Sequence, residues 1–405
     1  MADLKVKTYN NISDKGLEAL PRRLYEVGAS LEAPDAILLR SAQLHDEEIP
    51  DSVKAIARAG AGVNNIPVDR MTQAGVPVFN APGANANAVK ELVIAGLLMG
   101  LRNLPEAAKF VDGVEGEGEA FEKAIEAGKK QYVGRELPGR RLGVIGLGAI
   151  GGNVANAARS LGMEVMGFDP GLTVEHAWRL MSDIRQARNL DELLSECDVV
   201  TLHAPLNENT RNLISAERLR GMRKDAVLLN FARDGLVDTD AVVEALNNDR
   251  LGGYITDFPK PALRNNPKIL AFPHLGASTG EAQENAALMA VQNLRDFLEN
   301  GNIRCSVNFP EVVMPRSEGY RLGVINANLP NMVGQMTTAL ADANLNIIDL
   351  LNRSKGEIAY TLLDLDGPVP DATLERIQAI EGVIRVRANP ANENGNTTPS
   401  QDRSA

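Results

Sequence analysis

The sequence predicts an α/β protein with two lobes built on parallel sheets and a small C-terminal domain of ferredoxin-like βαββαβ order. Short apolar runs alternate with helical patterns over most of the chain, which is typical of parallel sheets. A glycine-rich turn joins an apolar strand to a helix near residue 146. After residue 320 the expected order becomes strand, helix, two strands, helix and strand, as in ferredoxin-like domains.

Length and composition limit the possible classes of protein. A chain of 405 residues exceeds the usual size of one core, so two or three domains are expected. With 44% hydrophobic and 23% charged residues and no apolar run long enough to cross a bilayer, the chain has the composition of a soluble protein. The first ten residues carry no targeting pattern, so the cytoplasm is the default expectation. Cys197 and Cys305 fit neither a disulfide framework nor a metal site.

The charge balance argues against a nucleic-acid-binding protein. The formal net charge is −11, whereas nucleic-acid binding depends on lysines and arginines that neutralise phosphates. The C-terminal domain also lacks the aromatic pattern of an RNA-recognition domain. An anionic substrate would therefore need arginines within its own binding site to offset the negative charge of the protein.

The first lobe begins with strand and helix signals in alternation. We expect strands at AILL before Arg40 and at 76–79, and helices at 50–60 and 87–103. A long helix follows at 280–300, then a connector rich in proline. These patterns assign residues to domains as follows: 1–98 and 283–310 to the first lobe, 99–282 to an inserted second lobe, 317–390 to the C-terminal domain, and 391–405 to a disordered polar tail. Closure of the two lobes would exclude water from a bound substrate.

The segment GLGAIG predicts a dinucleotide site. Gly146 permits a tight turn, Gly148 lets the backbone approach a pyrophosphate, and Gly151 lets the helix pack closely on the strand. The next strand ends at Asp169, about 20 residues on, where an acid holds the ribose hydroxyls. A carboxylate there would repel a 2′-phosphate, which favours NAD over NADP. The alternative is an ordinary strand-to-helix turn with Asp169 as a helix cap.

Three further segments match one family by type and order: DVVTLHAPLNENTRNLI at 198–214, LLNFARDGLVDTDAV at 228–242 and PHLGAST at 273–279. With the glycine turn they resemble the D-isomer-specific 2-hydroxyacid dehydrogenases, and the C-terminal domain makes the chain similar to the phosphoglycerate-specific branch of that family. The resemblance covers nearly everything up to residue 390. It implies two Rossmann-like lobes and a C-terminal ACT regulatory domain, with NAD-dependent oxidation of 3-phospho-D-glycerate to 3-phosphohydroxypyruvate, the first step of L-serine biosynthesis.

The resemblance assigns two catalytic residues. His274 takes the proton of the C2 hydroxyl while hydride leaves for the nicotinamide, a role that suits an imidazole near neutral pH. Arg233 grips the substrate carboxylate and polarises the C2 oxygen, for which its planar fork suits better than lysine. The resemblance also implies that the following residues contact the cofactor: Ala149, Ile150, His203, Ala204, Pro205, Thr210, Phe231, Ala232, Asp257 and Gly276. For His203 the alternative is equally open, a histidine at a strand end whose ring is satisfied by the backbone.

The sequence departs from the family in two places. The common Arg-Gly pair is here Arg233-Asp234-Gly235, which adds an acid beside the substrate-binding arginine. The glutamate that usually pairs with the catalytic histidine is absent, because TDFPKPALRNN holds no acid between Asp257 and Glu281. Without that anion to favour the imidazolium, we expect alcohol oxidation to persist to lower pH than in relatives with the glutamate.

The resemblance also places substrate and regulatory contacts. Arg40 and Arg58 match the phosphate grip, with the backbone near Gly62 and Val63 for the carboxylate and Asn85 as a further contact; surface ion pairing is the alternative for both arginines. In the C-terminal domain, Asn326, Asn328 and Asn346 fall where serine-sensitive relatives hold their ligand. The alternative is that this domain only assembles subunits of a homo-oligomer, a dimer or tetramer.

Two other functions remain open from the sequence. The chain could be another D-2-hydroxyacid dehydrogenase, acting on glycerate, lactate or a sugar acid. It could also be a non-catalytic NAD-sensing interaction protein. No NADH production across a panel of hydroxy acids, with NAD still bound, would favour the second.

Overall fold

The computed structural model describes residues 4–317 and 319–389, so the tail expected at 391–405 lies outside the described residues. The chain divides into two compact units, with boundaries between Ala84 and Asn85 and between Ala282 and Gln283. Two sheets are parallel and a third is antiparallel. The predicted α/β fold class, with two parallel-sheet lobes and a βαββαβ domain, is therefore confirmed.

The first unit contains a five-stranded parallel sheet in the order β2-β1-β3-β4-β5. Its strands are β1 (Leu4–Thr8), β2 (Tyr25–Gly28), β3 (Ala36–Leu39), β4 (Ala55–Arg58) and β5 (Val78–Phe79), and its short helices are α1 (Asp14–Glu18) and α2 (Val68–Gln73). The helix predicted at 50–60 is wrong, because β4 occupies that segment. Ala55, Ile56 and Ala57 are buried on both faces of the sheet, and burial on both faces removes the alternation that marks a strand in the sequence.

The predicted helix at 280–300 is confirmed as α11 (Gly280–Asn300), which completes this unit. Its apolar side chains, among them Val291, Leu294 and Phe297, join the core that covers the five-stranded sheet. Gly16 of α1 meets it so closely that an added Cβ would lie 2.7 Å from the Cβ of Ala287. Thus a segment far along the chain closes the first lobe.

The second unit holds a seven-stranded parallel sheet in the order β12-β11-β10-β9-β6-β7-β8. The strands are β6 (Arg141–Ile145), β7 (Glu164–Phe168), β8 (Arg185–Gln186), β9 (Val199–Leu202), β10 (Val227–Asn230), β11 (Gly253–Thr256) and β12 (Ile269–Ala271). The order reverses beside β6, because β7 and β9 lie on its two sides. Such a switch point opens a ligand crevice at the carboxyl ends of the strands.

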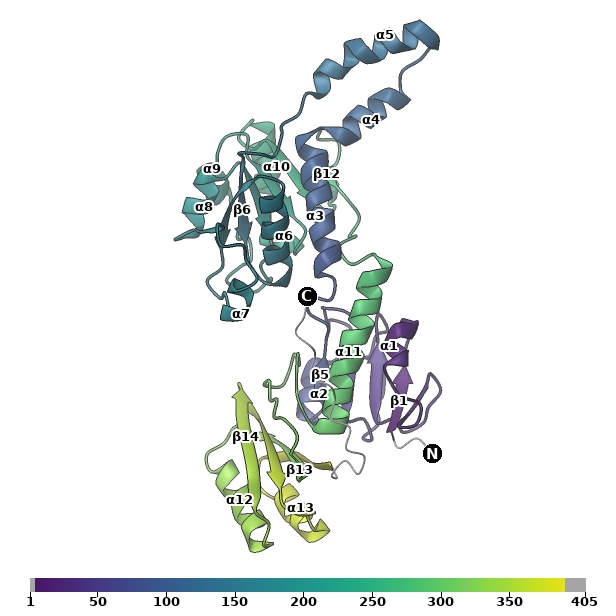
Figure 1. Ribbon diagram of the computed structural model, residues 1–405, viewed down its shortest axis with the longest axis vertical. Coiled ribbons are helices and arrows are strands. Elements are labelled where there is room, and N and C mark those ends of the chain that lie inside the picture. The colour runs from purple at the N-terminus through teal and green to yellow at the C-terminus, as the bar shows by residue number, and fades with distance from the viewer. Residues whose placement is uncertain (1–3, 318, 390–405) are drawn as a thin grey trace. The chain divides into compact units, whose positions relative to one another are not determined.

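Helices cover both faces of this sheet (Figure 1). On one face α3 (Ala86–Leu101) packs beside α6 (Ala149–Ser160), and on the other lie α8 (Leu190–Glu196), α9 (Ala216–Gly221) and α10 (Thr239–Asn247). The whole of α3 shares its core with the second unit, through residues such as Val93 and Leu97. The predicted strand, glycine turn, helix and strand at 141–168 are confirmed by β6, α6 and β7.

Two helices project from the second unit as an arm, α4 (Leu104–Asp112) and α5 (Gly118–Gly128) (Figure 1). Neither contains a buried residue. The rings of Phe110 in α4 and Tyr132 contact one another, with centroids 5.5 Å apart and planes tilted by 39°. The remaining short elements of this unit are α7 (Val174–Ala177) and the 3-10 turns Lys129–Tyr132, Asp234–Leu236 and Pro261–Leu263.

The C-terminal domain has the predicted βαββαβ order: β13 (Tyr320–Ala327), α12 (Met332–Asp342), β14 (Ile347–Lys355), β15 (Ile358–Leu365), α13 (Asp371–Gln378) and β16 (Val383–Asn389). Its antiparallel sheet runs β14-β15-β13-β16. The helices bury Met336, Leu340 and Ile377 against one face of the sheet. From the other face Tyr360 and Leu362 join the core around α11.

A buried arginine fixes the junction between this domain and the first lobe. Arg321 uses all five of its N–H donors: two reach Asp364 at 2.6 and 2.8 Å, and three reach the carbonyls of Asn300, Met314 and Pro315. Asn300 ends α11, so one side chain joins that helix, the connector and β15. Burial raises the pKa of Asp364, but the hydrogen bonds from Arg321 outweigh it and hold that pKa below its usual value.

A second contact of the same junction comes from β16. Arg385 donates to the carbonyls of Val53 and Asp51, and Arg387 donates to that of Lys54. The guanidinium of Arg387 also lies over the Phe297 ring, 4.9 Å from its centroid. Burial, together with the charge of Arg385, lowers the pKa of Arg387 to about 9.

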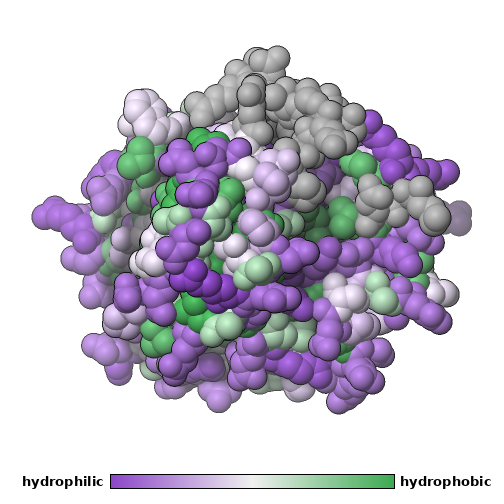
Figure 2. Space-filling view, turned by 90° about the horizontal axis from the view of Figure 1, so that it is seen from below, coloured by the Kyte–Doolittle hydropathy of each residue, from purple (hydrophilic) through white to green (hydrophobic). Residues whose placement is uncertain are grey.

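The surface agrees with the composition. In the view of Figure 2 hydrophilic residues predominate, with hydrophobic ones in small groups between them. Among the described residues, no helix has both the length and the apolar character that a membrane span requires.

Candidate active site

The glycine turn after β6 is closely packed at two of its glycines and open at the third. Gly146 has φ +90°, and a Cβ there would lie 2.6 Å from the carbonyl oxygen of His203. A Cβ on Gly151 would lie 1.9 Å from the carbonyl oxygen of Gly146. At Gly148, by contrast, an added Cβ meets nothing within 4 Å. Two glycines are therefore demanded by packing, whereas Gly148 borders the open space into which a pyrophosphate fits.

Asp169 is fixed above this turn at the end of β7. Its Oδ2 accepts a hydrogen bond from the Leu147 N–H and its Oδ1 one from the Gly171 N–H, each 2.8 Å long. The backbone thus orients the carboxylate at the carboxyl edge of the sheet. A fixed anion at this place accepts hydrogen bonds from ribose hydroxyls and repels a 2′-phosphate. The geometry fits the adenosine half of NAD.

His203 follows β9 and lies against the glycine turn. Its Nε2 is 3.0 Å from the Thr201 hydroxyl, while Nδ1 is buried without a hydrogen-bond partner. Burial lowers the pKa of His203 to about 3, so the ring is neutral. Its ring is therefore satisfied on one nitrogen only, by a side chain and not by the backbone.

The loop after His203 is held by its own side chains. The Thr210 hydroxyl donates to the Pro205 carbonyl at 2.6 Å and accepts from the Asn207 N–H at 2.8 Å. Ala204 and Pro205 thereby keep a fixed backbone at the edge of the cofactor crevice. The hydrogen bonds of Thr210 therefore stabilise the conformation of this loop.

Arg233 lies on the loop after β10, and hydrogen bonds with the Asn230 side chain fix the backbone of this loop. The Asn230 side chain is buried, donates to the Arg233 carbonyl at 2.9 Å and accepts from the Ala232 N–H at 3.2 Å. This explains why an asparagine precedes the arginine by three residues. The Arg233 side chain itself is exposed and donates to the Ala232 carbonyl, and it forms no ion pair with a described acidic side chain.

The ring of Phe231 is part of the core. It is 4% exposed and lies 6.4 Å from the Phe272 ring, and it fills the space beside Gly96 of α3. Any contact of Phe231 with a cofactor must therefore come from its backbone.

His274 follows β12 and contacts the loop after β11. Its ring centroid is 5.0 Å from that of Phe258, with the planes tilted by 50°. Asp257 is 1% exposed; its Oδ2 accepts from the Gly276 N–H at 3.3 Å, and its Oδ1 has no partner. Burial raises the pKa of Asp257, and the charge of His274 opposes that rise. A buried carboxylate thus lies close enough to interact with the imidazole electrostatically.

The second unit brings most of the predicted site residues together. The glycine turn, Asp169, His203, Arg233 and Asp257 each follow a strand of one parallel sheet, so they share its carboxyl edge. His274 follows β12 and reaches the same edge, because its ring contacts Phe258. Ala149 and Ile150 begin α6.

The predicted substrate arginines lie together in the first unit. Arg58 Nε donates to the Arg40 carbonyl at 2.9 Å, and its Nη1 donates to the Gly62 carbonyl at 2.6 Å. Arg40 donates to the Gln283 side chain at 2.8 Å. Burial, followed by the charge of Arg40, lowers the pKa of Arg58. Neither guanidinium pairs with a carboxylate in the part of the chain that the structure describes.

Other predicted contacts have plainer surroundings. Val63 adjoins Gly62 in the same turn and packs partly against the core beside β4. Asn85 is the N-cap of α3, and its side chain makes no capping hydrogen bond. It belongs to the second unit, whereas Arg40 and Arg58 belong to the first.

The sequence did not point to the supporting residues. Gln283, which contacts Arg40, lies on α11 far along the chain. Lys260 belongs to the segment that lacks the family glutamate, and its amine pairs with Asp234 at 2.9 Å. Neither residue has a signal in a single sequence, because each depends on a contact between distant segments.

Comparison with known proteins decides the family. Residues 94–276 match the family described as D-isomer specific 2-hydroxyacid dehydrogenase, NAD binding domain. The chain is 35% identical over 339 residues to a D-3-phosphoglycerate dehydrogenase of Haemophilus influenzae, covering 80% of this chain and 78% of that protein. The chain belongs to the D-isomer-specific 2-hydroxyacid dehydrogenase family. A protein of the same name from Escherichia coli K12 is 34% identical over 366 residues, covering 86% and 85%.

Two solved structures similar to this chain agree with the assignment. An NAD+-bound 3-phosphoglycerate dehydrogenase from Entamoeba histolytica matches with a TM-score of 0.56 at 26% identity, over 76% of this chain and 99% of that one. A glyoxylate reductase from Paecilomyes thermophila matches with a TM-score of 0.59 at 28% identity and the same coverage. The second unit is thus the NAD-binding domain of a family dehydrogenase, and NAD is its cofactor.

Proposed function

We propose that the protein oxidises 3-phospho-D-glycerate to 3-phosphohydroxypyruvate with NAD, as the first step of L-serine biosynthesis. The pair formed by Arg40 and Arg58 supports this substrate most directly. Two guanidinium groups lie close enough for one to lower the pKa of the other, and neither has a carboxylate partner among the described residues. Such a pair favours a doubly charged phosphate. The relatives named D-3-phosphoglycerate dehydrogenase support the same substrate.

The proposed chemistry assigns one task to each residue. NAD, when bound, accepts the hydride from C2 of the hydroxy acid. His274 accepts the proton of the C2 hydroxyl, so the C2–O single bond becomes a carbonyl. Arg233 holds the carboxylate and stabilises charge on the C2 oxygen. Arg40 and Arg58 hold the phosphate, backbone N–H groups near Gly62 and Val63 the carboxylate, and Asn85 is a further contact.

A spectrophotometric screen of phosphorylated and unphosphorylated 2-hydroxy acids with NAD tests the proposal. We expect NADH formation with 3-phospho-D-glycerate at a kcat/KM far above that for D-glycerate or D-lactate. Preference for an unphosphorylated acid would favour another D-2-hydroxyacid dehydrogenase. NAD binding without NADH formation from any acid would favour a non-catalytic NAD-sensing protein. The same assay, run in reverse, tests 2-oxoglutarate as a second substrate.

We infer that the protein works as a homo-oligomer, a dimer or tetramer, in the cytoplasm. The arm formed by α4 and α5 supports this inference, because neither helix buries a residue within the chain. Leu104, Val111 and Val133 expose 47%, 46% and 79% of their surface, and short isolated helices need tertiary contacts to be stable. Light scattering of the wild type and of Val111→Glu tests it: we expect an oligomer that the substitution weakens.

We propose that the C-terminal domain is an ACT domain and binds L-serine near Asn326. The Asn326 side chain is buried, and its Oδ1 has no hydrogen-bond partner. Asn328 donates to the Gly356 carbonyl at 3.2 Å, and the Asn346 N–H donates to Asp366 at 2.9 Å. An unpartnered buried oxygen is the kind of acceptor that a small polar ligand satisfies.

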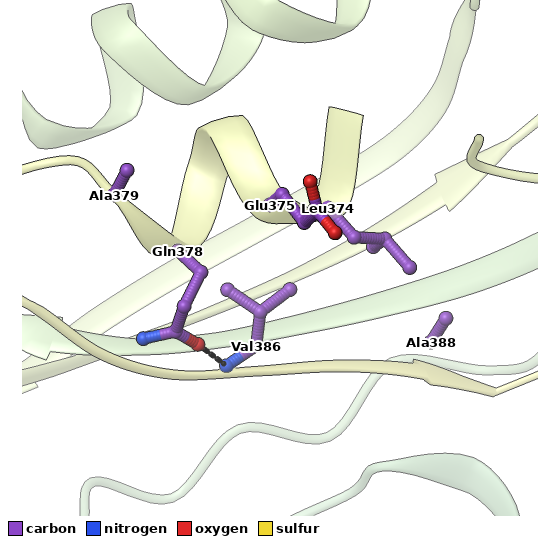
Figure 3. Close-up of a pocket in the computed structure, with 6 residues that line it drawn as sticks. All are labelled: Leu374, Glu375, Gln378, Ala379, Val386 and Ala388. Atoms are coloured by element: carbon purple, nitrogen blue, oxygen red, sulfur yellow. Dashed lines mark hydrogen bonds between the residues drawn. The ribbon is translucent and has the colours of Figure 1, made fainter. Parts of the chain in front are cut away.

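The two edge strands of this sheet differ, because a side chain bonds to the backbone of β16. The Gln378 amide accepts from the Val386 N–H at 3.0 Å and donates to the Ile384 carbonyl at 3.3 Å, so it covers the free edge of β16 (Figure 3). The shallow groove of about 400 Å³ beside it is lined by α13 and β16. We infer that the opposite edge, β14, pairs with a second copy of the chain. Calorimetry with serine, and assays with serine added, test the binding; no heat and no inhibition would mean that the domain only assembles subunits.

A further inference from the structure

Two departures from the family pattern meet in one contact. Asp234, the extra acid after Arg233, forms an ion pair with Lys260, with Oδ1 and Nζ 2.9 Å apart. Lys260 also donates to the Thr239 hydroxyl at 3.0 Å, where α10 begins. Both side chains are partly exposed, Asp234 by 47% and Lys260 by 39%. A pair this exposed adds little to stability, so stability is a poor reason for its presence.

The position of Asp234 explains why it needs a partner. It is the chain neighbour of Arg233, whose guanidinium is exposed and has no acidic partner among the described residues. A carboxylate free to reach that guanidinium would compete with the carboxylate of the substrate. Charge-assisted pairs between arginine and carboxylate are strong and often bidentate. An unpaired Asp234 would therefore weaken substrate binding.

Lys260 reaches Asp234 because its loop is anchored beside the loop of Arg233. The Thr256 hydroxyl donates to the Asn230 carbonyl at 2.9 Å and accepts from the Phe258 N–H at 3.1 Å. Lys260 lies four residues after Thr256. The segment from Thr256 to Lys260 is therefore tied to the loop of Arg233 at its start, through the Asn230 carbonyl, and at its end, through Asp234. The amine is thus held where it meets Asp234 and Thr239.

From this arrangement we propose that Lys260 is a positioning residue that holds the carboxylate of Asp234 away from Arg233 and so keeps Arg233 available to the substrate carboxylate. The inference rests on the proposed role of Arg233 and extends it. Lys260 does not touch the substrate. Its effect appears only when Asp234 is present, which separates this role from a general structural one.

Kinetics of four variants test the proposal with 3-phospho-D-glycerate and NAD. We expect Lys260→Met to raise the KM of the hydroxy acid about tenfold while kcat and the KM of NAD change less than about threefold. Asp234→Asn alone should stay within about threefold of the wild type, and Asp234→Asn/Lys260→Met should return to that range. Lys260→Arg keeps the positive charge and should rescue most of the loss.

A matched control comes from the same unit. Lys268 pairs with Asp249 and is 34% exposed, close to the 39% of Lys260, although Asp249 is more exposed than Asp234. Lys268→Met therefore removes a lysine–aspartate pair away from the site and should leave all constants unchanged. The proposal is overturned if Lys260→Met matches this control, or if the double variant is as impaired as Lys260→Met. A wild type that forms no NADH from any hydroxy acid would instead overturn the proposed function, and the inference with it.

Discussion

The buried carboxylate of Asp257 accepts a hydrogen bond from the Gly276 N–H, two residues beyond His274, with Oδ2 and N 3.3 Å apart. Its Oδ1 has no partner, and burial raises the pKa of Asp257 while the charge of His274 opposes that rise. In general, an ionised carboxylate beside an imidazole favours the protonated ring. The carboxylate of Asp257 therefore interacts electrostatically with the ring of His274.

Replacing Asp257 by asparagine removes that anion. We expect Asp257→Asn to move the acidic limb of kcat/KM for alcohol oxidation to lower pH, because His274 must be neutral to accept the proton. The pH profile of the wild type should already have a lower acidic limb than that of a relative with the glutamate. Asp191→Asn, at an exposed position, is the control. An unmoved limb in Asp257→Asn contradicts the coupling.

The same substitution has a predicted sign for stability. A carboxyl group whose pKa is raised by folding destabilises the native state at pH values above that pKa, and the cost fades as pH falls through it. Asp257→Asn should therefore be more stable than the wild type at pH 8, and the gain should vanish near pH 4, about the ordinary pKa of aspartate. Urea unfolding at the two pH values measures this; a gain that grows on acidification contradicts the sign.

The glycine turn separates packing from ligand binding. Gly151→Ala forces a Cβ to within 1.9 Å of a carbonyl oxygen, and we expect it to lower the free energy of unfolding by about 1–3 kcal/mol. Gly148→Ala places its Cβ in open space, so unfolding without cofactor should change by less than about 0.5 kcal/mol while NADH affinity falls. Urea unfolding and NADH titration distinguish them. Equal stability losses would show that Gly148 is also a packing residue.

The arginine pair predicts where substrate specificity resides. We expect Arg40→Met to lower kcat/KM for 3-phospho-D-glycerate by about tenfold or more, from loss of a charge-assisted hydrogen bond, with little change for D-glycerate. Arg304→Met is the control, because Arg304 is paired with Asp296 in the same unit. Equal losses on both substrates would mean that Arg40 does not bind the phosphate.

The Arg321–Asp364 pair predicts a stability effect in the first unit. Both side chains are fully buried, and Arg321→Met leaves Asp364 without its partner, which costs about 3–5 kcal/mol for buried pairs. Since the pKa of Asp364 is held low, the deficit should shrink as pH falls through that pKa and the carboxyl is protonated. Chemical unfolding at neutral and acidic pH measures both. A deficit below 1 kcal/mol at neutral pH would contradict this account.

How far the sequence predicted the structure depended on the range of the contacts. The strand, turn and helix around Gly146 follow from local geometry, and so does the βαββαβ order. The helix predicted at 50–60 is wrong because burial of the strand Ala55–Arg58 on both faces leaves a short apolar run without alternation. Pattern alone does not tell such a strand from a buried helix segment.

Contacts between distant segments were out of reach of the pattern. Arg321 and Arg387 look like ordinary solvent-facing strand residues in the sequence, yet one is buried against α11 and the other reaches the Lys54 carbonyl. The Asp234–Lys260 pair depends likewise on two loops meeting. Motifs predicted which residues would touch ligands, whereas the residues that hold those in place required the fold.

In the proposed reaction, His274 accepts the proton of the C2 hydroxyl. Single-turnover mixing of His274→Gln with NAD and 3-phospho-D-glycerate tests it most directly, with NADH binding measured on the same protein. We predict NADH formation at least about 100-fold slower than in the wild type, with NADH affinity within about twofold. Formation at a rate close to that of the wild type would contradict the assignment.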